Sequence, residues 1–438
     1  SNFLMDAFLP AQPSQDEAWQ ARAREQILAQ AERVRRQHAD GEHVRANLLD
    51  TLGHVCLRLD LVDDAEPLLR EALAIRELAF GTRSLEYALS LRSLGQFAYQ
   101  VGDFAQAAEM LGSALQLHRE LGSSTHTNVA ALANDLAACL RNLARDAEAE
   151  ALHLEALQLR RASGAATLPV AESLNNLAGV HLGRAEFELA VAELREALAI
   201  RASILGDAHP LTLQTLSNLA AALWRHGARD EALSVTQRAE AGYRALGGDG
   251  ERELGVALSN HAAMQLETGD LDGAAANLSE ALELQTARLG DDHPLVAVSL
   301  AKLAALHHAR HRDGEARASW ESVLRIRRAA QDSPRELADA LYGYGLFLAD
   351  VGEFQAALEA VEEVLALHRS KGFDDPVASG RAEYVLGECL ARVGPREEAR
   401  PHFAEAPRRV DASTGAPPAA RSRRWPSASS IFRTSRSN

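Results

Sequence analysis

The sequence is poor in aromatic residues, cysteine and lysine, and these shortages narrow what the protein can be. Aromatic residues make up 5% of the 438 residues, and Lys302 and Lys371 are the only lysines among 46 basic residues. The cysteines Cys56, Cys139 and Cys389 lie far apart, without a CxxC pair or a disulfide-framework spacing. A disulfide scaffold and a structural zinc module are therefore both disfavoured. No apolar run reaches the roughly 18 residues that a membrane-spanning helix needs.

The chain is acidic, with 61 acidic and 46 basic residues and a net charge of −15. The charge is uneven, because residues 407–438 hold seven arginines and one aspartate, a balance of 7 − 1 = +6. Residues 1–406 therefore carry −15 − 6 = −21. Nucleic acids and anionic membranes bind proteins through clustered positive charge. Because the body of this chain is acidic, we expect neither as the main partner.

Both ends of the chain differ from its body. Residues 407–438 are rich in Pro, Ser and Ala and lack helical periodicity, so we predict a disordered basic tail. Two origins fit it, a natural tail or a shifted reading frame in a GC-rich gene, and we slightly favour the second. The chain begins at Ser1 rather than Met, which we interpret as a fragment or a tag scar.

A small residue follows a large apolar residue at intervals of 41 or 42 residues through most of the sequence. An alanine stands twelve residues after each of these anchors, nine times out of nine. Such a strict period predicts nine copies of one structural unit, over residues 44–406. The anchors are Gly53, Gly95, Ala137, Ala178, Ala220, Ala262, Ala304, Gly345 and Gly387.

Each unit has the pattern of two amphipathic helices joined by a turn. Leu174, Leu177 and His181 follow the i, i+3, i+7 spacing of one helix face, and a second such pattern starts at Phe187. The small anchors suit a close crossing of the two helices. We therefore predict an all-α fold, a right-handed α-solenoid (superhelix) of about nine helical pairs.

The pattern L-x-x-L-G/A, followed by the spaced alanines, resembles the tetratricopeptide repeat (TPR). The string 174–178 (Leu-Asn-Asn-Leu-Ala), the 42-residue period and the Gly-Asp-x-His-Pro segments within 205–210 and 289–294 are similar to the longer repeats of kinesin light chains. The resemblance implies a non-enzymatic scaffold for protein–protein interaction, with a protein or peptide ligand. It leaves the identity of the partner and the oligomeric state open.

Residues 1–43 carry a second resemblance. The strings 3–8 (Phe-Leu-Met-Asp-Ala-Phe), 23–28 (Ala-Arg-Glu-Gln-Ile-Leu) and 44–53 resemble the region after the membrane helix in bacterial transmembrane serine/threonine protein kinases. This implies an alternative function, the detached C-terminal sensory or regulatory region of such a kinase. We expect a cytoplasmic location, or an extracytoplasmic one if the alternative holds.

Within the N-terminal segment, residues 16–38 have the pattern of a single helix. Its apolar side carries Ile27, Leu28, Ala31 and Val34. We predict that it caps the exposed end of the first repeat, as the ends of a solenoid require.

Catalytic and cofactor motifs are not found. There is no glycine-rich phosphate loop, no His-Arg-Asp or Asp-Phe-Gly string, no HExxH and no Gly-x-Ser-x-Gly. His307, His308 and His311 invite a metal site, but the repeat register places them at a core, a groove and a turn position. We therefore expect no metal, no cofactor and no catalytic residue, and we interpret the cysteines as inward-facing packing residues.

The clearest functional pattern lies two residues before each anchor. We call these positions the ladder: Thr51, Ser93, Asp135, Asn176, Asn218, Asn260, Lys302, Gly343 and Val385. Asparagine offers donors and an acceptor in one planar group, so a row of them can hold an extended peptide by its backbone. In families that resemble this one, asparagines at this position have that role. The alternative is that they are solvated residues that support packing. The predicted peptide-binding residues are Asn134, Asp135, Asn175, Asn176, Asn218, Asn260 and Lys302, with Arg92, Arg141, Trp224 and Arg225 as neighbours.

Overall fold

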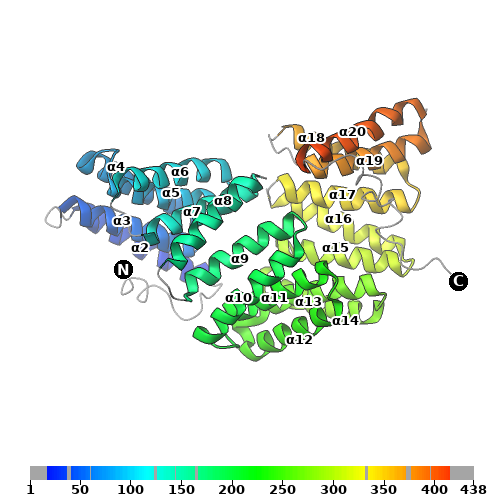
Figure 1. Ribbon diagram of the computed structural model, residues 1–438, viewed down its shortest axis with the longest axis horizontal. Helices are drawn as coiled ribbons and strands as arrows, with labels where there is room; N and C mark the ends of the chain where they lie inside the picture. Colours follow the sequence, from blue (N-terminus) through cyan, green and yellow to red (C-terminus); the bar gives the residue numbers. More distant parts are fainter. Residues whose placement is uncertain are drawn as a thin grey trace. The chain divides into compact units, whose positions relative to one another are not determined.

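The computed structural model describes residues 17–36, 41–59, 61–122, 126–143, 145–162, 166–330, 334–370, 376–394 and 396–414. Within these ranges the chain is α-helical apart from short connections and one 3₁₀ turn, with no strand (Figure 1). The residues group into two compact units, 1–184 and 185–438. The predicted all-α repeat fold is confirmed, and the boundary between the units falls inside the fourth repeat.

In the described part of the first unit, helix α2 is followed by helical pairs. Helices α3 and α4, α5 and α6, and α7 and α8 pack as pairs, and each pair packs on the next. The helices are α2 (Glu17–Arg36), α3 (Gly41–Arg58), α4 (Val62–Phe80), α5 (Leu85–Gln100), α6 (Phe104–Leu121), α7 (His126–Asn142), α8 (Asp146–Arg161) and α9 (Leu168–Gly183).

The second unit continues the same arrangement, from the pair α11 and α12 to the pair α19 and α20. Its helices are α10 (Phe187–Leu205), α11 (Pro210–His226), α12 (Arg229–Leu246), the 3₁₀ helix η1 (Gly247–Gly250), α13 (Glu251–Thr268), α14 (Leu271–Leu289), α15 (Pro294–Ala309), α16 (Asp313–Ala329), α17 (Pro334–Asp350), α18 (Phe354–Ser370), α19 (Pro376–Val393) and α20 (Arg396–Thr414). No helix in the described part of the chain is both long and apolar enough to cross a bilayer.

The small anchors are required by the crossing of the two helices in a pair. A Cβ added to Gly53 would lie 2.7 Å from Cδ2 of Leu69, and one added to Gly95 would lie 2.7 Å from Cγ of Leu111. Both distances are far below van der Waals contact, so a larger residue would displace the leucine side chain or move the helices apart. The packing reason predicted from the sequence is therefore present in the structure.

The linker at 205–210 shows how one repeat stops and the next begins. Gly206 has φ of +86°, which ends α10 in a conformation that suits glycine. Nδ1 of His209 then accepts a hydrogen bond from the backbone N–H of Leu211 at 3.2 Å, and Pro210 occupies the first helical position. The linker at 289–294 repeats this pattern. The linker histidines are thus helix caps.

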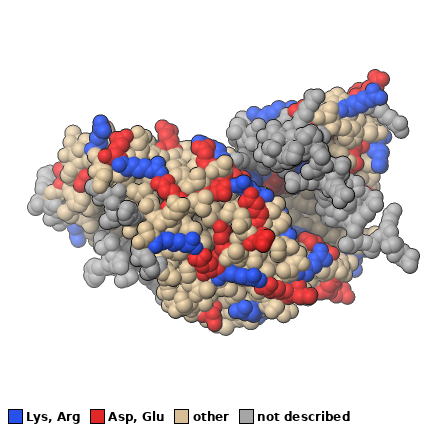
Figure 2. All heavy atoms as spheres, viewed as in Figure 1, with Lys and Arg blue, Asp and Glu red and all other residues tan. Residues whose placement is uncertain are grey.

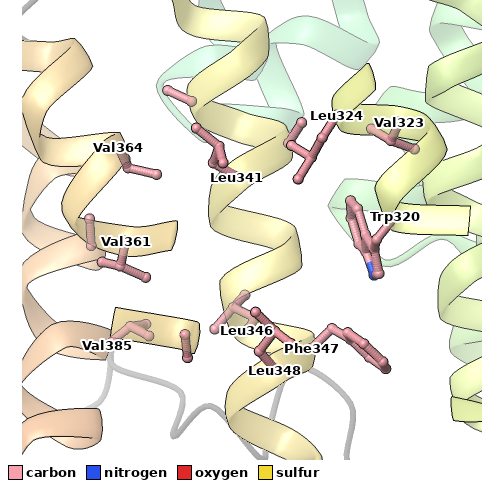
Figure 3. Packing of buried hydrophobic residues seen from close by; sticks show 14 of the residues in the cluster. Trp320, Val323, Leu324, Leu341, Leu346, Phe347, Leu348, Val361, Val364 and Val385 are labelled. Carbon is pink, nitrogen blue, oxygen red and sulfur yellow. The ribbon is translucent and has the colours of Figure 1, made fainter. Parts of the chain in front are cut away.

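A large apolar cluster fills the interior of the C-terminal repeats (Figure 3). Trp320 on α16 and Phe347 on α17 belong to it, together with smaller side chains such as Val361 and Val385. A Cβ on Gly343 would lie 2.6 Å from Cη2 of Trp320. Trp320 therefore fits because the ladder residue of the following helix has no side chain.

The predicted N-terminal helix exists as α2 and packs on the first repeat. Ile27, Ala31 and Val34 are buried in the same cluster as Leu49 of α3. Arg24 binds Asp64 of α4 through Nε at 2.6 Å, which further fixes α2. The prediction for Leu28 was wrong, because this side chain is 36% exposed. It follows Ile27 directly and so points about 100° away around the helix.

The C-terminal boundary also needs a correction. We predicted that helical structure ends at Ala406, but α20 continues to Thr414. The backbone of 407–414 is therefore helical rather than part of a disordered tail. The φ that proline imposes lies in the helical range, so the helix can continue through Pro407, although proline has no N–H to donate to the preceding turn and crowds the carbonyl there. The rest of the predicted tail, 415–438, lies outside the described residues.

Candidate functional site

The first helices of successive repeats contact each other directly in both units. In the first unit α3, α5, α7 and α9 form such a row, and in the second unit α11, α13, α15, α17 and α19 do so. The ladder positions lie on these helices. Each row therefore brings residues that are 41 or 42 positions apart in the sequence to one surface.

In the first unit, Asp135 on α7 is paired with the preceding repeat. Its Oδ2 accepts hydrogen bonds from Nη2 of Arg92 at 3.1 Å and from Nε2 of Gln96 at 3.1 Å, both on α5. The predicted residues Arg92 and Asp135 are thus brought together. Their charges balance each other at this half-buried position.

Asn176 on α9 reaches back in the same way. Its Nδ2 donates to Oδ1 of Asn134 on α7 at 3.0 Å. Asn134 is only 4% exposed, and its Oδ1 also lies 3.1 Å from Nδ1 of the buried His153. Burial lowers the pKa of His153 to about 4, so this imidazole is neutral at physiological pH. We predicted Asn134 for the groove surface, but its amide is committed to neighbours within the protein.

A hollow of about 670 Å³ opens between α3 and α5. The ladder residues Thr51 and Ser93 line it, and so does Arg76 from α4. Arg76 is 1% exposed and donates to Oγ of Ser90 at 2.6 Å and to Oδ1 of Asn47 at 2.7 Å. Arg76 is thus held by hydrogen bonds within the protein, and the hollow has a mixed lining that also includes Val44, Leu48 and Leu89.

In the second unit, Lys302 on α15 connects two repeats. Its Nζ donates to Oγ of Ser259 at 2.9 Å and to Oδ1 of Asn260 at 3.0 Å, both on α13. The Oγ of Ser299 lies 3.0 Å from Oγ of Ser259 and 2.7 Å from Oε1 of Gln285 on α14. A chain of neutral oxygens therefore runs inward from the ammonium. Burial lowers the pKa of Lys302 to about 8.

Gln285 belongs to a series that was not predicted from the sequence. In successive second helices, the position 23 residues after the anchor carries an Arg, His, Tyr or Gln side chain. Several of these side chains form hydrogen bonds with the next repeat. Arg201, for example, donates to Oγ1 of Thr215 at 2.7 Å. Aligning the repeats would have revealed this series, because a polar side chain recurs at a position of the second helix where an apolar residue is expected. The members are Arg76, His118, Arg160, Arg201, Tyr243, Gln285, Arg327 and His368.

The remaining predicted residues lie at different depths. Asn175 and Asn218 are half-buried and Asn260 is exposed. Arg141 is exposed, and its Nη1 lies 2.5 Å from where a Cβ on Gly179 of α9 would be. Arg225 is exposed, with its guanidinium carbon 5.1 Å from the ring centroid of Phe187.

Trp224, which we expected to face the groove, is buried at 8% exposure. Its Nε1 donates to Oε2 of Glu267 on α13 at 2.8 Å, and Arg229 covers its ring. The repeat register predicted a surface position for Trp224, but the large indole side chain extends inward between α11 and α13. We therefore leave it out of the binding surface.

His308 and His311 lie at a turn, and the cysteines lie in the core. His311 adopts φ of +57° at a turn, and Nδ1 of His308 lies 2.8 Å from Oδ1 of Asp313. Across the ranges that the structure describes, no group of three or more His, Cys, Asp or Glu side chains could hold a metal ion. All three cysteines are buried, and burial raises the pKa of Cys139 to about 12. Such thiols are poor nucleophiles.

Arginine–glutamate pairs link many of the second helices. Arg195 of α10 binds Glu231 of α12 at 2.7 Å, and Arg244 of α12 binds Glu280 of α14 at 2.9 Å, with 36 residues between partners in both cases. On the face seen in Figure 2, acidic and basic side chains are interspersed. Exposed pairs of this kind contribute about 0–1 kcal/mol each. The second helices thus neutralise many of their own charges.

The helical pairs, their stacked first helices and the polar row on them define a helical-repeat scaffold for protein–protein interaction. A family model described as tetratricopeptide repeat matches residues 44–117, 92–162, 169–245 and 253–329, which together cover more than half of the chain. The chain belongs to the tetratricopeptide repeat family. No curated protein matches the sequence.

The solved structures that match this chain include other helical repeat proteins. A Rap protein complexed with Competence and Sporulation Factor is 13% identical, with a TM-score of 0.57 over 84% of this chain and 98% of that one. The apo form of RapI is 15% identical, with a TM-score of 0.53 over 66% and 99%. A Podospora anserina protein assigned as a kinesin light chain, with nearly identical TPR-like repeats, is 20% identical, with a TM-score of 0.42 over 48% and 99%.

The resemblance of the N-terminal strings to a kinase region has no counterpart among these matches. The family match begins at residue 44, after most of that segment. The string 3–8 lies outside the described residues, and the string 23–28 forms part of α2. The kinase alternative therefore stays a prediction.

Proposed function

We propose that this scaffold binds an extended segment of a partner protein along its first helices, mainly through the backbone of that segment. The observation that carries the proposal is the reach of the ladder side chains. Asn176 extends to α7 and Lys302 extends to α13, each across one repeat step. Amides and hydroxyls held at this spacing offer donors and acceptors to a chain that crosses the helices.

Several features of the surface support this function. Asn260 is exposed on α13, and the half-buried Asn218 lies on α11, the first helix next to it. A row of neutral amides can form hydrogen bonds with the backbone of a ligand, so binding depends little on the side chains of the ligand. The Rap protein of similar fold is complexed with Competence and Sporulation Factor, which is compatible with ligand binding by this architecture. We expect reversible binding of moderate affinity, because the ligand must be ordered.

The proposal is tested with peptides that are selected for binding to the purified protein. A phage library of random 12-residue peptides is panned against the purified chain, and selected peptides are measured by isothermal calorimetry. Replacing Asn218 and Asn260 together by alanine, both in the second unit, is expected to weaken binding about tenfold, since backbone hydrogen bonds of about 1 kcal/mol each are lost. The helical circular dichroism should be unchanged.

A matched control uses an asparagine on a second helix. Asn277 of α14 donates to Oε1 of Gln265 at 2.7 Å and is not on the ladder. Asn277→Ala should leave peptide affinity as it is, whereas Asn260→Ala alone should reduce it. Equal affinities for the wild type and the double variant would refute the asparagine clamp.

A further inference from the structure

Short ladder side chains border the hollow of about 670 Å³ between α3 and α5. Elsewhere on the ladder, the longer Asn176 and Lys302 cross to the preceding first helix. Thr51 instead stays on its own helix, where Oγ1 donates to the backbone oxygen of Asn47 at 2.8 Å. Ser93 on the facing helix is shorter still, so the space between α3 and α5 is left open.

The charged groups that line the hollow are balanced in pairs. Nη1 of the buried Arg76 lies 3.4 Å from Oδ1 of Asp50, and Nη2 of Arg92 lies 3.1 Å from Oδ2 of Asp135. A cationic ligand group would meet the two arginines, and an anionic one would meet Asp50. A charged group therefore loses hydration here without gaining a net counter-charge, and a neutral group is favoured.

Hydrogen-bonding groups of both kinds are left over in the lining. Among the described residues, no donor lies within hydrogen-bond distance of Oδ2 of Asp50, whose nearest basic nitrogen is Nε2 of His54 at 3.9 Å. The guanidinium of Arg76 donates to Ser90, Asn47 and Asp50, but its Nε has no partner in the described part of the chain. A ligand group that donates and accepts at once would complement this pair.

The walls of the hollow are apolar on both helices. Val44 and Leu48 line it from α3, one turn apart, and Leu89 lines it from α5. Val44 is 43% exposed and Leu89 is 41% exposed. Covering these side chains with methylene groups of a ligand is favourable, and apolar walls around a few polar groups are typical of a binding pocket.

We propose that this hollow binds the side chain of a glutamine in an extended partner segment, with its amide against Asp50 and Arg76. This inference rests on the proposed function and adds a site for one ligand side chain in the first unit. The amide N–H group donates to Oδ2 of Asp50, and the amide oxygen accepts from the guanidinium of Arg76. The two methylene groups of glutamine lie against the walls formed by Val44 and Leu89, which favours glutamine over the shorter asparagine.

The ligand amide can be observed directly by NMR. The probe is the acetylated and amidated heptapeptide Gly-Ser-Ala-Gln-Ala-Ser-Gly, labelled with ¹⁵N in the glutamine side-chain amide and titrated with the purified full chain. The two side-chain N–H signals are expected to shift and broaden saturably. The unlabelled peptide with Glu in place of Gln should displace the probe about tenfold less effectively than the unlabelled Gln peptide, because its carboxylate loses hydration beside Asp50.

Thr51→Leu fills the hollow and should abolish the response of the probe. Thr286→Leu on α14 is the matched control, because Oγ1 of Thr286 donates to the backbone oxygen of Leu282 at 2.8 Å just as Thr51 does within α3. Both threonines are half-buried, and Thr286 does not line the hollow. The control should leave the response as in the wild type, and circular dichroism checks that both variants are folded.

Asp50→Asn separates ligand binding from a purely structural role of this carboxylate. The substitution removes the negative charge and leaves that of Arg76 without its partner at 3.4 Å. The preference should therefore shift from the glutamine peptide toward the glutamate peptide. Equal weakening of both peptides would contradict the role of Asp50 as the acceptor of the amide.

Three outcomes would overturn the inference: no response of the amide signals to the wild type, the same response to Thr51→Leu as to the wild type, or equal displacement by the glutamine and glutamate peptides. Failure of the proposed function is read separately, from selected peptides whose affinity is unaffected by the double replacement of Asn218 and Asn260. Neither asparagine lines the hollow, so the two failures are distinguishable.

Discussion

Single side chains set how closely the helices approach in this protein. Gly95 packs against Leu111 within a repeat, and Gly343 makes room for Trp320 between repeats. In both cases a large side chain on one helix is matched by the absence of one on another. Gly343 is also a ladder position, and there the missing side chain serves packing, because the Trp320 indole fills the space.

Gly95→Ala is expected to destabilise the first unit by about 1–3 kcal/mol, since the new Cβ would lie 2.7 Å from Cγ of Leu111. Gly112→Ala on α6 is the matched control, because a Cβ there meets nothing within 4 Å. It should stabilise the helix by about 0.5–1 kcal/mol by restricting the unfolded chain. Urea unfolding followed by circular dichroism measures both, and equal effects would contradict the packing account.

At the scale of elements, first and second helices have different tasks. First helices contact each other along a row and carry the ladder, whereas second helices exchange arginine–glutamate pairs with one another. The helix α2 stands apart from both, because among the described residues it is not paired with a second helix of its own repeat. It covers the apolar end of α3 and α4 through Ile27, Ala31 and Val34. This is the role of a cap in a repeat array.

Ile27→Asp should detach α2 and lower the free energy of unfolding by roughly 3 kcal/mol or more, because it places an unpaired charge in an apolar cluster. Leu28→Asp changes the neighbouring residue to the same side chain, and Leu28 is 36% exposed. Its effect should stay within about 0.5 kcal/mol. Thermal unfolding and limited proteolysis at α2 would reveal the difference. Equal destabilisation by both variants would rule out a cap that packs through the Ile27 side of α2.

At the scale of the whole molecule, stability is expected to follow from neighbouring repeats. Within each compact unit, 1–184 and 185–438, a helical pair packs on the pairs before and after it. A substitution therefore acts on its own repeat and on the adjacent ones. A perturbation in one unit should leave the energetics of remote repeats in the other unchanged.

Gly95→Ala and Gly343→Ala lie in different units, and each introduces a Cβ into a close contact. The loss in unfolding free energy of the double variant should equal the sum of the single losses within about 0.5 kcal/mol. The three variants are compared by calorimetric unfolding. A coupling above about 1 kcal/mol would show that distant repeats cooperate more strongly than nearest-neighbour packing allows.

The sequence by itself determined the repeat. Because the same pattern of small and apolar residues recurs every 41 or 42 residues, each unit packs as the same pair of helices. The anchors and the helix–turn–helix pattern of each unit were readable from residue type, since each depends on local backbone or on volume. The ladder positions were also found in this way. The boundary at Ala406 was misplaced, because a composition change does not by itself end a helix.

Only the tertiary structure decided which ladder and groove residues remain available to a ligand. The burial of Asn134 and Trp224 and the pairing of Asp135 with Arg92 depend on side chains from neighbouring repeats. No residue-by-residue pattern contains these contacts, because they join positions some 40 residues apart and depend on side-chain volume and direction. The hydrogen bonds of Lys302 to Ser259 and Asn260 could not be predicted for the same reason, since these partners lie 43 and 42 residues earlier in the sequence.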